Sequence, residues 1–218
     1  ALMWDAIATR NARLLNQGIR SLPDKLEQAT WLNYARCHDD IGLGFDDRDI
    51  AAVGYEPRAH RRFLLEYFTG KFPGSPAHGQ PFGQNEKTGD ARIAGSLASL
   101  VGLESALADD DEHAVQAGIE RILLLHGLII AFGGIPLLYY GDEIGMGDNI
   151  FLGDRNGVRT PMQWSPDRNA GFSRANPQQL YLPIIVNPEF HVDVINVESH
   201  DSIRHSLRWW MRRLISLR

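Results

Sequence analysis

Cysteine is almost absent from this chain, since Cys37 is the single one among 218 residues. An internal disulfide is therefore impossible, and cysteine usage gives no indication of the redox compartment. A lone cysteine acts more often as a small apolar core residue than as a reactive thiol. Stability must then come from a packed core, which a chain of 24.4 kDa is long enough to form.

Positive charge is not in excess either. The formal net charge is −5 and the calculated pI is near 5.9. Nucleic acids and anionic membranes attract a basic face, so we expect neither as a partner. No secretory signal is visible, and we therefore expect a cytoplasmic protein.

Long hydrophobic runs are scarce as well. Residues 122–140 are long and apolar enough to suggest a membrane span, but Gly133, Gly134 and Pro136 interrupt them near the middle. A helix that ends at the glycine pair, followed by a buried strand, explains this composition better than a membrane span of about 20 residues. No internal repeat or low-complexity tract is present, and no metal-binding motif or cofactor motif predicts a bound group.

Two strand-forming stretches are present, and both end in acidic residues. The first covers residues 31–40 and ends in a histidine followed by two aspartates. The second covers residues 133–143 and ends in an aspartate and a glutamate. Buried strands separated mainly by helical sequence are typical of neighbouring units in a parallel α/β sheet or barrel, where active-site groups follow the strand ends.

The rest of the chain is expected to be helical or irregular. The spacing of apolar residues predicts helices over residues 2–18, 64–68, 91–107, 113–130 and 202–217. Residues 72–83 are too rich in proline and glycine for a regular element, and loops of this length usually cover or shape a site. Residues 146–188 are expected to be irregular.

His38, Asp39 and Asp40 admit three interpretations. They could be ordinary residues at a strand end, one buried and paired and the others exposed. They could belong to a metal site of the phosphohydrolase kind, although the other histidines lack the helical spacing that such sites use. They could also form a sugar site, in which a carboxylate stabilises an oxocarbenium-like transition state and the histidine binds sugar hydroxyls.

A turn with two arginines follows the second strand. Asn156-Gly157 is a strong turn signal, and Arg155 and Arg159 flank it. The guanidinium groups could bind a pair of carboxylates bidentately, or they could simply be solvated on a surface turn.

These motifs resemble glycoside hydrolase family 13, the α-amylase superfamily. Residues 36–40 resemble the motif of barrel strand 7, and residues 134–143 resemble that of strand 8. Residues 1–134 are similar to amylosucrases, whereas residues 141–218 are similar to trehalose synthases and related α-glucosidases. The chain is then either a natural intermediate of the family or a junction of two genes.

The resemblance implies a fold and a division of the chain. The fold would be an incomplete (β/α)8 TIM barrel, with strands 7 and 8, flanking helices and an inserted subdomain. Residues 1–40 would hold the end of the helix 6 region and strand 7, and residues 41–106 the subdomain over the active site. Residues 107–145 would hold helix 7 and strand 8, and residues 146–218 the following loop and the terminal helix.

The resemblance also implies roles for individual residues. Asp39 would stabilise the transition state, and His38 would bind the glucosyl ring beside it. Asp40 would form the floor of the pocket by pairing with an arginine, for which Arg155 is the candidate. Other substrate contacts would come from Arg61 and Arg92 in acceptor subsites and from Arg159 near the pocket rim.

The family's nucleophilic aspartate and its acid/base glutamate have no counterpart in this sequence. Retaining chemistry needs both groups, roughly 5 Å apart, so the chain alone is expected to be inactive. We expect part of an amylosucrase-type glucosyltransferase that uses sucrose, with a trehalose synthase or α-glucosidase that uses maltose as one alternative. A non-catalytic carbohydrate-binding remnant is another alternative. A partner supplying the N-terminal part of the barrel is also expected.

Overall fold

The computed structural model describes residues 1–39, 41–86 and 90–218, and most of its regular structure is helical. The α-helices are α1 (Leu2–Thr9), α2 (Arg13–Arg20), α3 (Asp47–Ala52), α4 (Pro57–Phe68), α5 (Leu97–Val101), α6 (Leu103–Ala108), α7 (Glu112–Ala131), α8 (Val197–Ser202) and α9 (Leu207–Ser216). Short 3-10 helices are η1 (Asp142–Ile144), η2 (Asn156–Val158), η3 (Arg168–Gly171), η4 (Pro177–Gln179) and η5 (Pro188–Phe190).

The two strands predicted to be neighbours pair in parallel. Strand β1 (Leu32–Asn33) lies beside β4 (Ile135–Pro136), with Leu32 opposite Ile135. The backbone amides of Ile135 and Leu137 donate to the carbonyls of Trp31 and Asn33, at 2.8 Å each. The ladder is much shorter than the expected strands, because the described residues supply only one neighbour to each strand.

The region between these strands contains a second, antiparallel pair. Strand β2 (Gln80–Phe82) pairs with β3 (Arg92–Ala94), and Ile41 forms an isolated bridge with Ile93. The expectation that residues 72–83 contain no regular element was therefore wrong. Pro81 is tolerated because β2 is an edge strand, where a missing N–H breaks no ladder.

Two predicted helices are divided in the structure. Residues 91–107 form β3, α5 and α6, and the last two meet at Gly102, whose φ is 89°. This left-handed conformation ends one helix and redirects the chain into the next. Residues 2–18 are likewise split into α1 and α2, because Arg10 adopts a left-handed conformation at the end of α1.

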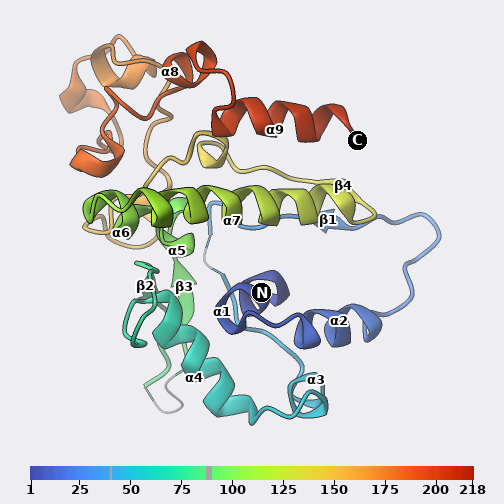
Figure 1. The fold of residues 1–218 in the computed structure, drawn as a ribbon. Coiled ribbons are helices and arrows are strands. Elements are labelled where there is room, and N and C mark those ends of the chain that lie inside the picture. Colours follow the sequence, from blue (N-terminus) through green and yellow to red (C-terminus); the bar gives the residue numbers. More distant parts are fainter. Residues whose placement is uncertain (40, 87–89) are drawn as a thin grey trace.

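The long helix α7 agrees closely with its predicted bounds. The Asp111 side chain accepts a hydrogen bond from the amide of Ala114 and caps the first turn. The helix ends at Ala131, just before the two glycines that precede β4. In Figure 1, α7 crosses the middle of the molecule, with α8 and α9 above it and α1 to α4 below it.

The core is continuous around α7. Ile122, Leu125 and Ile129 of this helix are fully buried, and α5, α6 and α9 pack against it. By length and composition α7 could cross a membrane, but a third of its most apolar stretch is buried in this packing. Core packing therefore accounts for part of its apolar character.

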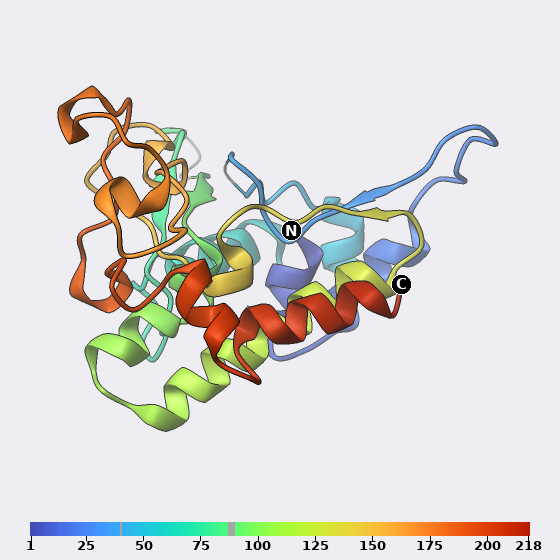
Figure 2. The ribbon, with the colours of Figure 1, turned by 90° about the horizontal axis from the view of Figure 1, so that it is seen from above.

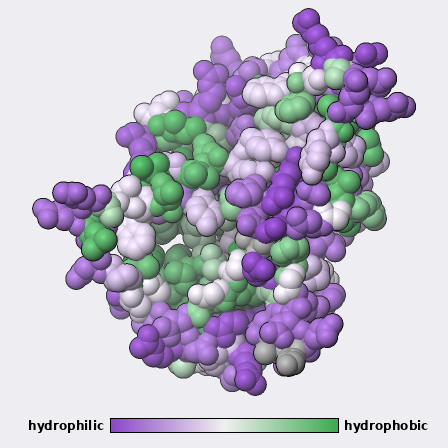
Figure 3. Space-filling model, turned by 180° about the vertical axis from the view of Figure 1, so that it is seen from behind, coloured by the Kyte–Doolittle hydropathy of each residue, from purple (hydrophilic) through white to green (hydrophobic). Residues whose placement is uncertain are grey.

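The parallel strand pair leaves large apolar side chains uncovered. Leu32 is 59% exposed and its partner Ile135 is 53% exposed. In Figure 2 both strands, drawn as a blue and a yellow arrow, lie on the right of the molecule. The irregular residues that precede α8, in orange, lie on the left. Seen from behind, apolar residues surround a hollow in the surface (Figure 3). A cavity of about 1010 Å³ lies between α1, α2 and the segment that contains β1.

Candidate functional site

The residues that follow β1 meet the loop that follows β4. The Arg155 guanidinium donates to the Asp39 carboxylate and also to Asp154, at 3.0 Å. The hydrogen bond to Asp39 is the main reason that the pKa of Arg155 is raised. Asp39 remains partly exposed, so its carboxylate is accessible to a ligand. Its predicted neighbour Asp40 lies outside the described residues.

Arg159 links the same two segments through the backbone. Its Nε donates to the carbonyl of His38 at 2.9 Å, and its Nη1 lies 3.8 Å from the Asp154 carboxylate. The His38 residue is exposed. The structure therefore brings together His38, Asp39, Arg155 and Arg159, four of the residues singled out in the sequence.

Phe82 connects this group to the inserted segment. The Arg155 guanidinium lies over the Phe82 ring at 4.7 Å from its centroid, and the Arg92 guanidinium at 5.5 Å. Both distances suit a cation–π interaction. Arg92 is thus joined to the Asp39 group through an aromatic ring that the sequence did not single out.

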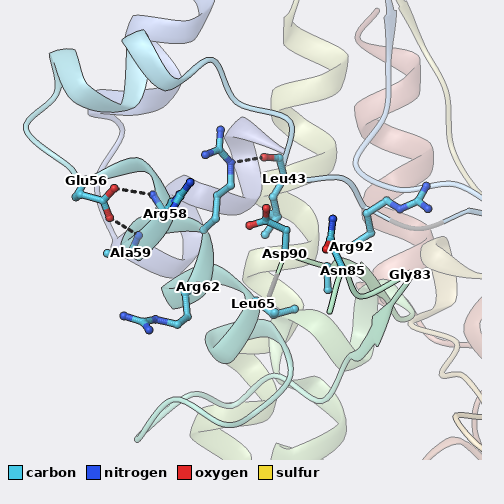
Figure 4. Close-up of a pocket in the computed structure, with 12 residues that line it drawn as sticks. Leu43, Glu56, Arg58, Ala59, Arg62, Leu65, Gly83, Asn85, Asp90 and Arg92 are labelled. Carbon is cyan, nitrogen blue, oxygen red and sulfur yellow. Dashed lines mark hydrogen bonds between the residues drawn. The ribbon is translucent and has the colours of Figure 1, made fainter. Parts of the chain in front are cut away.

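Arg61 lies apart from this group. Its guanidinium donates to the carbonyls of Leu43, at 3.2 Å, and Phe45, at 2.7 Å, and binds the Asp47 carboxylate. Arg61 and Leu43 both line a cavity of about 490 Å³, which Figure 4 shows in close-up. In this arrangement Arg61 holds the loop before α3, and its three contacts are all within the protein.

The same cavity contains other arginines, but they do not converge. Arg62 points away from Arg92 in Figure 4, and the Glu56 carboxylate caps α4 by accepting from the amides of Arg58 and Ala59. Convergent donors are what an anion site requires. The cavity is therefore lined by both positive and negative side chains, and these do not converge on one point where an anion could bind.

A buried ion pair lies behind the strand ends. Arg36 Nε donates to Asp142 at 2.8 Å, and both side chains are almost fully buried. Arg36 also lies over the Tyr139 ring. Burial raises the pKa of Asp142, although the charge of Arg36 opposes this, and burial lowers the pKa of nearby His126.

A second buried acidic group joins the inserted segment to the loop after β4. Asp148 accepts from the amide of Ser96, and Glu104 lies 3.2 Å from the His78 ring. Burial raises the pKa of Glu104, and the nearby charge of Asp148 raises it further. Burial likewise raises the pKa of Asp148.

Sequence reasoning missed both buried groups. A charged residue in an apolar run, such as Arg36, was the available signal, since a buried charge needs a partner. The partner itself is 106 residues away and could not be identified from sequence. Within residues 1–39, 41–86 and 90–218, no cluster of three or more His, Cys, Asp or Glu residues could hold a metal ion.

Comparisons with known proteins identify relatives. Residues 104–218 match the family described as "Alpha amylase, catalytic domain". A trehalose synthase of Pimelobacter sp. (strain R48) is 54% identical over 98 residues, which cover 45% of this chain and 17% of that protein. The trehalose synthase/amylase TreS of Mycobacterium tuberculosis is 46% identical over 125 residues, covering 56% of this chain and 20% of that protein.

A third relative is not named as an enzyme. The amino acid transporter heavy chain SLC3A1 of Mus musculus is 33% identical over 99 residues, covering 41% of this chain and 14% of that protein. The chain thus spans a fifth or less of the length of these three relatives.

Proposed function

Because the chain belongs to the α-amylase catalytic-domain family, we propose that it is part of a retaining α-glucoside-active enzyme of the trehalose-synthase type. The observation that carries this proposal is the similarity to two proteins named trehalose synthase, at 54% and 46% identity. The intact enzyme would convert maltose to trehalose through a covalent glucosyl-enzyme.

The amylosucrase interpretation, with sucrose as donor, has less support. It depends on the resemblance of residues 1–134, whereas the family match covers residues 104–218. The trehalose-synthase alternative therefore takes precedence over it here.

Asp39 would act as the electrostatic stabiliser of the cationic glycosyl species, with His38 beside the sugar ring. Both residues precede the matched range, so these roles derive from the strand-end motif. The contact with Arg155 supports these roles, because it fixes the Asp39 carboxylate just after the end of β1. Arg159 would line the rim, and Asp40, Arg61 and Arg92 keep their predicted substrate contacts as proposals.

In this proposal β1 and β4 are strands 7 and 8 of a (β/α)8 barrel, and the domain division given above applies. The remaining strands, the nucleophilic aspartate and the acid/base glutamate would come from another part of the enzyme. The uncovered apolar residues of the strand pair support such a partner, since a barrel has no free edges. The 218 residues alone would then be inactive.

The test is to express the longest reading frame that contains this chain and to assay maltose and sucrose by NMR. We expect trehalose to form from maltose, and Asp39→Asn to lower kcat by about 100-fold or more. Asp24→Asn, at an exposed position in the segment before β1, is the matched control and should keep full activity. Consumption of sucrose but not maltose, or full activity of Asp39→Asn, would contradict the proposal.

A non-catalytic protein is the second candidate, and the similarity to a transporter heavy chain favours it. In that case the longer protein would turn over neither maltose nor sucrose. Calorimetry with both sugars would then distinguish a sugar-binding protein from one that no longer recognises carbohydrate.

A further inference from the structure

Phe82, at the end of β2, is a half-buried aromatic ring that lies outside the hydrophobic core. Within the described part of the chain, the apolar side chains that form the core or pack against it do not include Phe82. Two cations lie over its ring instead, with the guanidinium carbons of Arg155 and Arg92 at 4.7 and 5.5 Å from the centroid. This ring therefore contributes mainly through the attraction between its face and positive charge.

The hairpin of β2 and β3 holds Phe82 in a fixed place relative to Asp39. The backbone amide of Ile41, just after the strand-end motif, donates to the carbonyl of Ile93 in β3 at 2.7 Å. The amide of Ile93 donates back to the carbonyl of Ile41 at 3.0 Å. The hairpin thus contacts both sides of the ion pair. It is bonded to the segment of Asp39 through the backbone, and it reaches Arg155 through the Phe82 ring.

Close packing does not by itself orient the Arg155 guanidinium. Together with Phe82 and Asp154, Arg155 lines a cavity of about 260 Å³ between the hairpin and the loop after β4. A long side chain beside open space keeps several rotamers unless its head group is held. The carboxylates of Asp39 and Asp154 attract the positive charge, whereas the ring restricts the guanidinium to the space over its face.

We propose that Phe82 is a positioning residue, which holds the Arg155 guanidinium against Asp39 and so fixes the carboxylate for catalysis. A carboxylate stabilises a developing cation best when its position is set before the reaction. Without the ring, Arg155 would turn into the adjoining cavity for part of the time, and Asp39 would lose an orienting contact. The consequence for catalysis rests on the proposed function, whereas the contact between Phe82 and Arg155 can be tested without it.

The mobility of the Arg155 guanidinium tests this contact in the 218-residue chain. Nitrogen NMR measures how fast a guanidinium rotates about its Nε–Cζ bond, and this rotation must break the hydrogen bond from Nη1 to Asp39. Arg155→Lys removes one signal and so assigns it. We expect Phe82→Leu, which removes the ring but stays apolar, to speed the rotation about fivefold or more. Phe82→Tyr keeps the ring and should stay within about twofold of wild type.

Two controls separate positioning from a general loosening of the fold. Arg159 contacts the same segment, since its Nε donates to the carbonyl of His38 at 2.9 Å. Its guanidinium should rotate at the same rate in wild type and in Phe82→Leu. Phe72→Leu makes the same substitution at a 38% exposed phenylalanine of the inserted segment and should leave Arg155 unchanged.

Maltose turnover gives a second measurement, in the longest reading frame that contains this chain. Phe82→Leu should lower kcat about fivefold or more and leave KM within about twofold, because the carboxylate it disturbs acts in the transition state. Phe82→Tyr should keep the wild-type kcat. A residue that only supported the fold would not give this split between kcat and KM together with rescue by the aromatic variant.

The inference is overturned if the Arg155 guanidinium rotates equally fast in wild type and Phe82→Leu, or if Arg159 is accelerated to the same extent. A Phe82→Tyr variant that behaves like Phe82→Leu, or an unchanged kcat of Phe82→Leu in an active longer enzyme, would also overturn it. Failure of the proposed function gives a different result. The longer wild-type enzyme would then not convert maltose, while the expected change at Arg155 would still support the contact with Phe82.

Discussion

Arg36 and Asp142 form the buried ion pair that ties the end of β1 to the residues after β4. Neither side chain has access to bulk water, and Arg36 Nη1 has no hydrogen-bond partner among the described residues. Removing one partner of such a pair leaves an uncompensated charge in the core.

We expect Arg36→Met to lower the free energy of unfolding by about 3–5 kcal/mol. Urea unfolding of the dilute protein, followed by tryptophan fluorescence, measures the change. Adding Asp142→Asn should recover part of the loss, since it removes the unpaired charge. Arg48→Met, in an exposed pair with Asp46, is the control and should not move the midpoint. An equal shift of the urea midpoint in Arg36→Met and Arg48→Met would show that the buried pair stabilises the fold no more than the exposed pair does.

Asp148 should make stability depend on pH. Burial raises its folded-state pKa above the ordinary value of 3.8, so the folded state binds the proton more tightly. The resulting stability is fully present below that value and is lost as pH rises through the folded pKa. Wild type should therefore lose stability relative to Asp148→Asn as the pH rises from about 4 toward neutrality.

Urea midpoints of both proteins across this pH range give the measurement. The difference between them is the relevant quantity, because Asp142 and Glu143 also have raised pKa values and contribute to both curves. The pKa of Glu104 is raised partly by the charge of Asp148, so its contribution changes together with that of Asp148. Parallel curves would mean that Asp148 titrates normally in the folded protein.

Strand β4 depends on the glycine that precedes it. Gly134 has a φ of 115°, and a Cβ at this position would lie 2.5 Å from the carbonyl oxygen of Trp31. Trp31 accepts the first hydrogen bond of the β1–β4 ladder, so any side chain here pushes the strands apart.

Gly134→Ala is expected to lower the free energy of unfolding by more than about 1 kcal/mol. Gly133→Ala is the matched control: a Cβ there meets no atom within 4 Å, and the change should stay within about 0.5 kcal/mol. Thermal unfolding followed by circular dichroism compares the two. Equal Tm values would show that the strand pair tolerates the displacement.

Several elements followed from local sequence, and others did not. The acidic cap and the glycine pair predicted the two ends of α7 correctly, because both signals act within a few residues. Residues 91–107 were predicted as one helix, because small apolar residues suit both a helix and a short buried strand. Residues 92–94 form strand β3 because they pair with β2, and this contact between distant segments cannot be seen in the local sequence pattern.

The uncovered strand pair should control the behaviour of the whole chain. Leu32 and Ile135 lie opposite each other with more than half of each side chain exposed. Unpaired edges and exposed apolar residues favour association with other chains. We expect the purified chain to self-associate as concentration rises, as measured by light scattering after size-exclusion chromatography.

Leu32→Lys should reduce this association, since a charge on an edge strand opposes edge-to-edge pairing. Leu124→Lys, at an exposed position on α7, is the control and should have less effect. A wild-type chain that stays monomeric at high concentration would contradict the expectation.

The sequence by itself determined the two strand-end motifs, the helix between them and the family to which the chain belongs, because these depend on patterns within short segments. Tertiary structure alone decided which charged groups meet. Arg155 lies 116 residues from Asp39, and Arg36 lies 106 residues from Asp142. Such pairings form only when packing brings distant segments together, and the cost of burying a charge then selects the partner.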